Sequence, residues 1–98
     1  MAFINALEPE SVTVSTTPVG ITTRPGGVGI KAGSALIVVE DQAIRYWLGA
    51  QNPSSSDGIE VAAGGVIELY DWQAVRTFSA VRAGGVDATL RVQPYVGW

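Results

Sequence analysis

The chain has 98 residues, of which 47% are hydrophobic and only 15% are charged, and its net charge is −3. This length suits one domain, and a free soluble domain normally carries roughly a quarter of charged residues. So little charge predicts that a partner covers part of the apolar surface, and we expect a homo-oligomer. The negative net charge disfavours nucleic acid as a partner, because the phosphates would repel the protein.

The first residues contain neither a basic region nor a long apolar run, so we expect no signal peptide. No apolar stretch approaches the roughly 18 residues of a membrane-spanning helix, so we expect no membrane partner. The sequence contains no cysteine, so disulfide bonds cannot stabilise the fold. These features predict a protein that is made in a cytoplasm, stays soluble and can later leave the cell inside an assembly.

Residues 1–10 are predicted to form an N-terminal arm. Phe3, Ile4 and Leu7 recur at helical spacing, but Pro9 prevents a longer helix. Three large apolar side chains so close together are costly to expose to water. We therefore expect this arm to pack onto a neighbouring subunit.

Residues 11–94 are predicted to form the folded domain, with short apolar or alternating segments between turn-forming residues. The expected strands cover residues 11–15, 19–23, 35–39, 43–48, 59–61, 66–70, 76–82 and 87–95. Seven or eight short strands with regular turns are typical of an all-β fold, an antiparallel β-sandwich or a jelly-roll-like barrel.

Several segments of this domain carry more detailed predictions. The apolar run 35–39 is expected to be the most buried strand and to form a hairpin with 43–48. The polar residues 49–58 predict an exposed, mobile loop. Asp71 is expected to cap one helical turn, and Pro94 indicates that the last strand ends at a sheet edge.

Residues 95–98 are predicted to be a C-terminal docking tail. They contain Tyr95, Val96 and Trp98, and aromatic side chains are preferred anchors at protein interfaces. Trp72 is a further candidate. The predicted interface residues are Phe3, Ile4, Leu7, Trp72, Tyr95, Val96 and Trp98.

The sequence offers little catalytic chemistry. Without histidine and cysteine it cannot build a Ser-His-Asp triad, a cysteine nucleophile or an ordinary zinc site. Glu60 and Glu68 could form a glycosidase-like carboxylate pair, but both alternate with apolar neighbours as solvent-facing residues do. The other alternative is a calcium ion bound by Glu40 and Asp41 together with Asp57 or Asp87. These carboxylates do not have EF-hand-like spacing. We expect no catalytic residue, no cofactor and no metal.

The aromatic residues allow two interpretations of their role. Trp47, Trp72 and Tyr70 could form a surface on which sugar rings stack. Alternatively, Tyr46 or Trp47 fills the core together with Phe78, which is the commoner use of aromatic side chains.

One combination of motifs points to a family. It consists of Ile44-Arg45-Tyr46-Trp47, the Pro53 loop, Gly58, and the segments 62–69 and 78–90. Over residues 35–93 this combination resembles short virion proteins of tailed bacteriophages, of the capsid decoration (cement) or head accessory type. The resemblance implies a β-sandwich on the capsid surface that bridges and stabilises neighbouring major capsid subunits. A carbohydrate- or receptor-binding module of the virion, or a tail or connector component, remains an alternative.

Overall fold

The computed structural model describes residues 5–6, 9–21, 33–49 and 51–96. Four of the predicted interface residues, Phe3, Ile4, Leu7 and Trp98, lie outside these ranges, as do the side chains of Trp72 and Val96. The described residues contain eight strands and one short helix.

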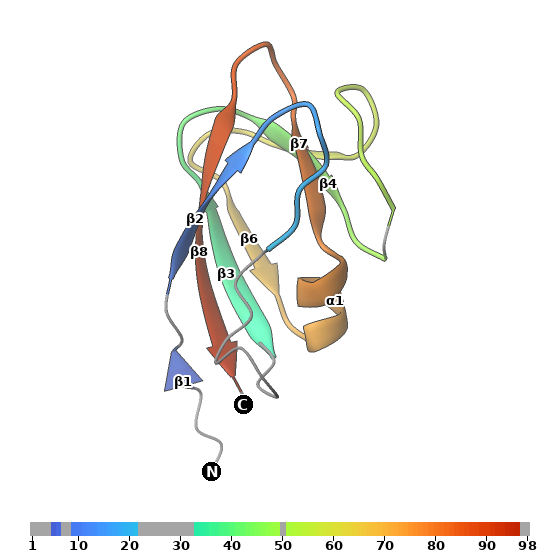
Figure 1. Cartoon of the computed structure of the whole chain (residues 1–98). Coiled ribbons are helices and arrows are strands. Elements are labelled where there is room, and N and C mark those ends of the chain that lie inside the picture. The colour runs from blue at the N-terminus through green and yellow to red at the C-terminus, as the bar shows by residue number, and fades with distance from the viewer. Residues whose placement is uncertain (1–4, 7–8, 22–32, 50, 97–98) are drawn as a thin grey trace.

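Two antiparallel sheets make up the fold (Figure 1). In the first, the long strand β8 (Ala88–Val96) pairs on one side with β3 (Ser34–Val39), which in turn pairs with β6 (Val66–Leu69). On its other side β8 pairs with β1 (Asn5–Ala6) and β2 (Glu10–Val14).

The second sheet has three strands in the order β5–β4–β7. They are β5 (Ile59–Val61), β4 (Ile44–Trp47) and β7 (Ser79–Arg82). The helix α1 (Trp72–Thr77) connects β6 of the first sheet to β7 of the second. The predicted all-β fold class is confirmed: the architecture is sandwich-like, and it is not a closed barrel.

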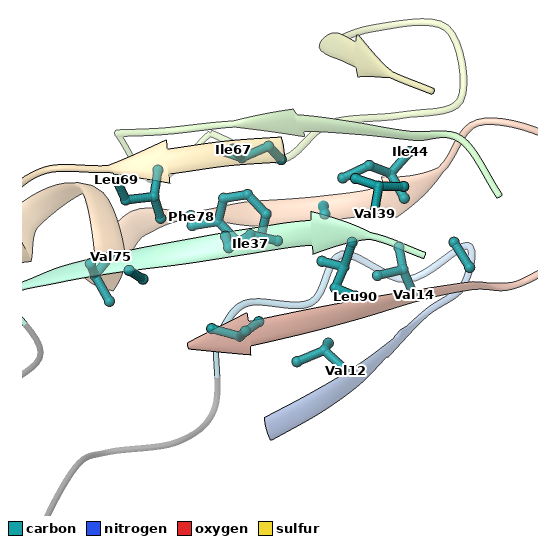
Figure 2. Close-up of a cluster of buried hydrophobic side chains, with 14 residues drawn as sticks. Val12, Val14, Ile37, Val39, Ile44, Ile67, Leu69, Val75, Phe78 and Leu90 are labelled. Carbon is teal, nitrogen blue, oxygen red and sulfur yellow. The ribbon is translucent and has the colours of Figure 1, made fainter. Parts of the chain in front are cut away.

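The core lies between the inner faces of the two sheets (Figure 2). Ile37, Ile44 and Leu90 are fully buried there, and the ring of Phe78, between α1 and β7, packs among them. Burying each such side chain contributes about 1.5–3 kcal/mol. In β8 the predicted alternation is confirmed, since Ala88, Leu90 and Val92 are buried.

The predicted hairpin between 35–39 and 43–48 is wrong. β3 pairs with β8 and β6, whereas β4 lies in the other sheet. Beyond the end of β3, the Glu40 N–H still donates to the Thr89 carbonyl at 2.9 Å, and the Asp41 carboxylate accepts from the Thr89 N–H at 2.9 Å. These long-range bonds hold the turn against β8, so the chain leaves it toward the second sheet.

Pro94 does not mark a sheet edge, because β8 has neighbours on both sides. The bond from Glu40 to Thr89 sets the alternation along β8, so Pro94 and Ala35 face each other as a non-hydrogen-bonded pair. The proline nitrogen therefore points away from β3. On that other side β2 pairs up to Val92 and β1 from Tyr95, so the missing N–H falls between the two pairings.

The predicted helical turn after Asp71 is confirmed, and its cap has the expected geometry. The Asp71 carboxylate accepts from the Ala74 N–H at 2.8 Å. The helix continues to Thr77, so the strand predicted to begin at Arg76 begins only at Ser79. Of the strand predicted over 19–23, the described part makes one isolated bridge, Val19 with Ala80.

The predicted division into arm, domain and tail does not follow the strand boundaries. Glu10, placed in the arm, begins β2, and Tyr95 and Val96, placed in the tail, are the last residues of β8. β1, also in the predicted arm, pairs with the end of β8 (Figure 1). Hydrogen bonding of β8 on both sides carries the sheet past both predicted boundaries.

Candidate interaction surface

The sandwich has two lateral sides, and one of them is closed by the chain itself. After β2 the chain crosses to the outer edge of β7, where the Arg82 N–H donates to the Ser15 carbonyl at 2.9 Å. Val19 and Ala80 then exchange two backbone hydrogen bonds of 3.0 and 2.9 Å. We call this the closed side, since the edges of β2 and β7 are joined across it.

On the opposite side, two strand edges have no partner strand within the described ranges. This side is formed by β5 and β6, which are the outer strands of their sheets and are linked by the short turn 62–65. Three large apolar side chains are exposed along it: Ile59 by 48%, Val66 by 56% and Tyr70 by 76%. Together with the exposed carboxylates of Glu60 and Glu68, we call these residues the open side.

The backbone at the β6 edge follows from its register with β3. The Val39 N–H donates to the Gly65 carbonyl at 2.9 Å, which makes Ile67 and Leu69 the residues of β6 that hydrogen-bond to β3. The N–H and C=O groups of Val66 and Glu68 consequently point away from the sheet. Within the described ranges no backbone hydrogen bond engages them.

The side chains at this edge interact with each other. The Tyr70 hydroxyl donates a hydrogen bond to the Glu68 carboxylate. This bond, and to a smaller extent the negative charge of Glu68 and partial desolvation, raises the pKa of Tyr70 above its ordinary value. Glu60 is instead paired with Arg45, at 2.9 Å between Nη2 and Oε1.

The acidic residues considered for metal or acid–base chemistry are dispersed. Glu60 and Glu68 lie on different sheets and are exposed, as predicted for solvent-facing residues. The other four each have a separate partner: Glu40 with Arg91, Asp41 with Thr89, Asp57 with Trp47 and Asp87 with Arg82. The described part of the chain contains no group of three or more potential metal ligands.

The aromatic residues divide between core and surface. Tyr46 and Phe78 pack together with ring centroids 5.4 Å apart, which confirms the core reading for this pair. Trp47 is half-buried, and its Nε1–H donates to Asp57 at 3.4 Å. Tyr70 belongs to the other sheet's edge, and no ring contact in the described ranges joins it to Trp47. Tyr95 is half-buried and faces Ser34 and Ala6 in the register of β8.

Three motif residues of the phage resemblance, Arg45, Pro53 and Gly58, lie close together. Arg45 donates to the carbonyls of Ser55 and Gly58 at 3.1 and 2.9 Å, in addition to its ion pair with Glu60. A Cβ on Gly58 would lie 3.2 Å from the Cβ atoms of both Arg45 and Pro53. The described part of the loop predicted to be exposed and mobile, 51–58, is hydrogen-bonded to β4 through Arg45, and Pro53 within it is buried.

The open side was missed by the sequence analysis. Ile59 and Val66 were assigned to strands, but the sequences of these segments do not indicate that β5 and β6 pair with another strand on one side only. The weak signal available is the pairing of two very short strands with an intervening Ala-Ala-Gly-Gly turn at 62–65. Short strands are typical of sheet edges.

Comparison with known proteins adds no relative. No family model, no curated protein and no solved structure matches the chain. The described residues contain no helix long and apolar enough to cross a membrane.

Proposed function

We propose that this chain is a structural protein of a tailed-bacteriophage virion, which decorates the capsid and bridges neighbouring major capsid subunits. The observation that carries the proposal is the open side, where two strand edges without a partner in the described part of the chain occur together with three exposed apolar side chains. The resemblance of residues 35–93 to capsid decoration proteins supplies the virion context.

The arrangement suits adhesion to another protein. Ile59, Val66 and Tyr70 are exposed side chains on strands, or next to strands, that are anchored in a common core. Such side chains are already ordered by the sheet, so binding costs little conformational entropy. Their partial burial by a partner would contribute on the order of 1 kcal/mol each.

The proposed mechanism is mechanical. A rigid sandwich that contacts two capsid subunits at once resists their separation without any chemical step. If the protein is an oligomer, and we propose a trimer, the contacts of its copies combine, and avidity makes modest individual contacts durable. The chain ends, with the predicted interface residues Phe3, Ile4, Leu7 and Trp98, would add apolar contacts.

The carbohydrate-binding alternative has less support. A stacking platform needs aromatic rings that face a sugar from one surface. Trp47 and Tyr70 belong to different sheets, and the Trp47 ring nitrogen is engaged by Asp57. We therefore favour a protein partner over a glycan.

The test is the occupancy of undecorated capsids of the phage that encodes the chain. Val66→Glu places a charge on the open side, and Val86→Glu is its matched control, since Val86 is 59% exposed in the turn between β7 and β8. The wild type and Val86→Glu should bind the particles and protect them against heat, whereas Val66→Glu should lose most of its occupancy. If the wild type leaves the capsids bare, or both variants bind equally, the proposal is wrong.

A further inference from the structure

The β6 edge has hydrogen-bonding groups in the geometry that an added strand requires. The N–H and C=O groups of Val66 and Glu68 point away from β3, which gives two donors and two acceptors in alternating order. Extended segments that bind proteins by strand addition use such a row of backbone groups for affinity. On the closed side the β7 edge is already occupied, because Arg82 and Ala80 are hydrogen-bonded to Ser15 and Val19.

The side chains at this edge describe the segment that would fit. Ile67 and Leu69 point into the core, so Val66 and Glu68 lie on the outer face of the sheet. Tyr70 follows Glu68 by two residues, and its hydroxyl reaches the Glu68 carboxylate. Along the edge, an exposed carboxylate is therefore flanked on each side by an exposed apolar group. Directly opposite residues on paired strands contact each other, so a partner segment meets this order in reverse.

Charge decides the residue opposite Glu68. The ion pairs found in the described ranges join Arg45 to Glu60, Arg82 to Asp87 and Arg91 to Glu40, so none of them uses Glu68. A lysine or arginine opposite Glu68 would compensate its charge, whereas a carboxylate there would be repelled. β6 itself contains no basic residue, so a second copy of β6 would leave Glu68 without a compensating charge in any register. The edge is thus better suited to a foreign segment.

We infer that the β6 edge binds an extended segment of another protein as an additional antiparallel strand, and that this segment has the pattern apolar-x-basic-x-apolar, with the basic residue opposite Glu68. The inference rests on the proposed role of the open side as an interface. Its test needs only the isolated protein and a peptide, so it can fail while binding to capsids holds, or succeed while the capsid proposal fails.

The experiment is an NMR titration of the full chain with the blocked peptide Thr-Thr-Val-Thr-Lys-Thr-Val-Thr-Thr. The amide signals of Val66 and Glu68 should shift saturably at millimolar peptide, and their hydrogen exchange should slow. The same peptide with Glu in the central position should bind roughly two- to fivefold more weakly, as expected for a reversed cross-strand charge pair. Absence of saturable shifts, or shifts centred on another strand, would overturn the inference.

Two variants test the register and the backbone contribution. Glu68→Lys should invert the preference, so that the glutamate peptide binds more tightly, whereas Glu40→Lys, a charge reversal at the end of β3 on an exposed residue, should leave it unchanged. Val66→Pro removes an outward N–H but no bond to β3, and should weaken binding about fivefold. An unchanged preference in Glu68→Lys contradicts the assignment, even if Val66→Pro fails to fold. Dimerisation of the free protein through β6, detected by light scattering and lost in Val66→Pro, would contradict it as well.

Discussion

The closed and open sides of the sandwich differ in what happens to the backbone groups at the strand edges. On both sides a strand of each sheet ends the hydrogen-bonded array. On the closed side the chain itself crosses between β2 and β7, and pairs with the β7 edge through Ser15 and Val19. On the open side β5 and β6 have no such cover within the described ranges, and each presents a glutamate, Glu60 or Glu68.

This difference separates stability from interaction. Free strand edges are templates for pairing with other chains, and natural proteins restrict this with short strands and charged side chains. β5 and β6 have three and four residues, and each carries one carboxylate, which limits unspecific edge-to-edge association. The closed side, in contrast, is expected to carry the stability of the fold. Substitutions on the two sides should therefore have different consequences.

The largest contrast is expected between two aromatic residues. Phe78, directly before β7, is 3% exposed, and Phe78→Ala should lower the free energy of unfolding by about 3–5 kcal/mol, because it removes the ring and leaves a cavity. Tyr70 is exposed on the open side, and Tyr70→Ala should change it by less than about 0.5 kcal/mol. Urea denaturation of both variants measures the difference. Equal losses would contradict the assignment of Phe78 to the core and of Tyr70 to the exposed open side.

A smaller loss is expected from Gly20 on the closed side. A Cβ at this position would lie 2.8 Å from the Phe78 carbonyl oxygen, so Gly20→Ala forces the chain away from β7. We expect a loss of about 1–3 kcal/mol, as for other overpacked sites. Gly84→Ala is the control, because a Cβ there has nothing within 4 Å. Equal unfolding temperatures of the two variants would mean that the closed side accommodates the added methyl group without loss of stability.

Arg45 tests how the open side is kept in place. Its guanidinium bonds to Ser55, Gly58 and Glu60, and thereby fixes β5 and the preceding loop to β4. Arg45→Ala should cost about 1–2 kcal/mol and accelerate amide exchange in β5 more than in β3. Arg82→Ala removes an ion pair with the single partner Asp87, whose side chain is half exposed, and should cost less than about 1 kcal/mol. Equal exchange rates in β5 of both variants would contradict this role of Arg45.

The features of the fold that depend on local sequence were predictable. The alternation in β8 identifies its inner face, and Asp71 identifies the start of α1, because each signal lies within a few residues of the element it describes. The pairing partners were not predictable in the same way. β3 and β4 are separated by a short turn that is typical of hairpins, but β8, some fifty residues further along, supplies the hydrogen bonds that decide where β3 lies.

The candidate site shows the same limit. The exposure of Glu60 and Glu68 follows from alternation with apolar neighbours, and both are exposed. Whether an edge is free depends on which strands lie outermost, and this is set by the topology of the whole sheet. Val66 has the sequence context of a core residue, yet it is more than half exposed, because it lies on the outer face of β6, the outermost strand of its sheet in the described ranges. Arg45 belongs to the motif 44–47, but its bonds to the loop before β5 depend on the tertiary fold and not on the local pattern.

The smallest expected effect is the ionisation of Tyr70, which reports on the open side directly. Its hydroxyl donates to Glu68, and this raises its pKa above the ordinary value of 10.0. Since the folded-state pKa exceeds the unfolded one, the bond stabilises the fold below pH 10, and its contribution is lost as the pH rises through the folded-state pKa. In Glu68→Ala both the acceptor and the negative charge are absent, so Tyr70 should ionise at lower pH than in the wild type. Phenolate absorbance during a pH titration measures this, with Tyr70→Phe to assign the signal and Glu60→Ala as the control. Coincident curves for the wild type and Glu68→Ala would show that the two side chains are not coupled in solution, and that Glu68 is free to meet a cation on a partner strand without first releasing Tyr70.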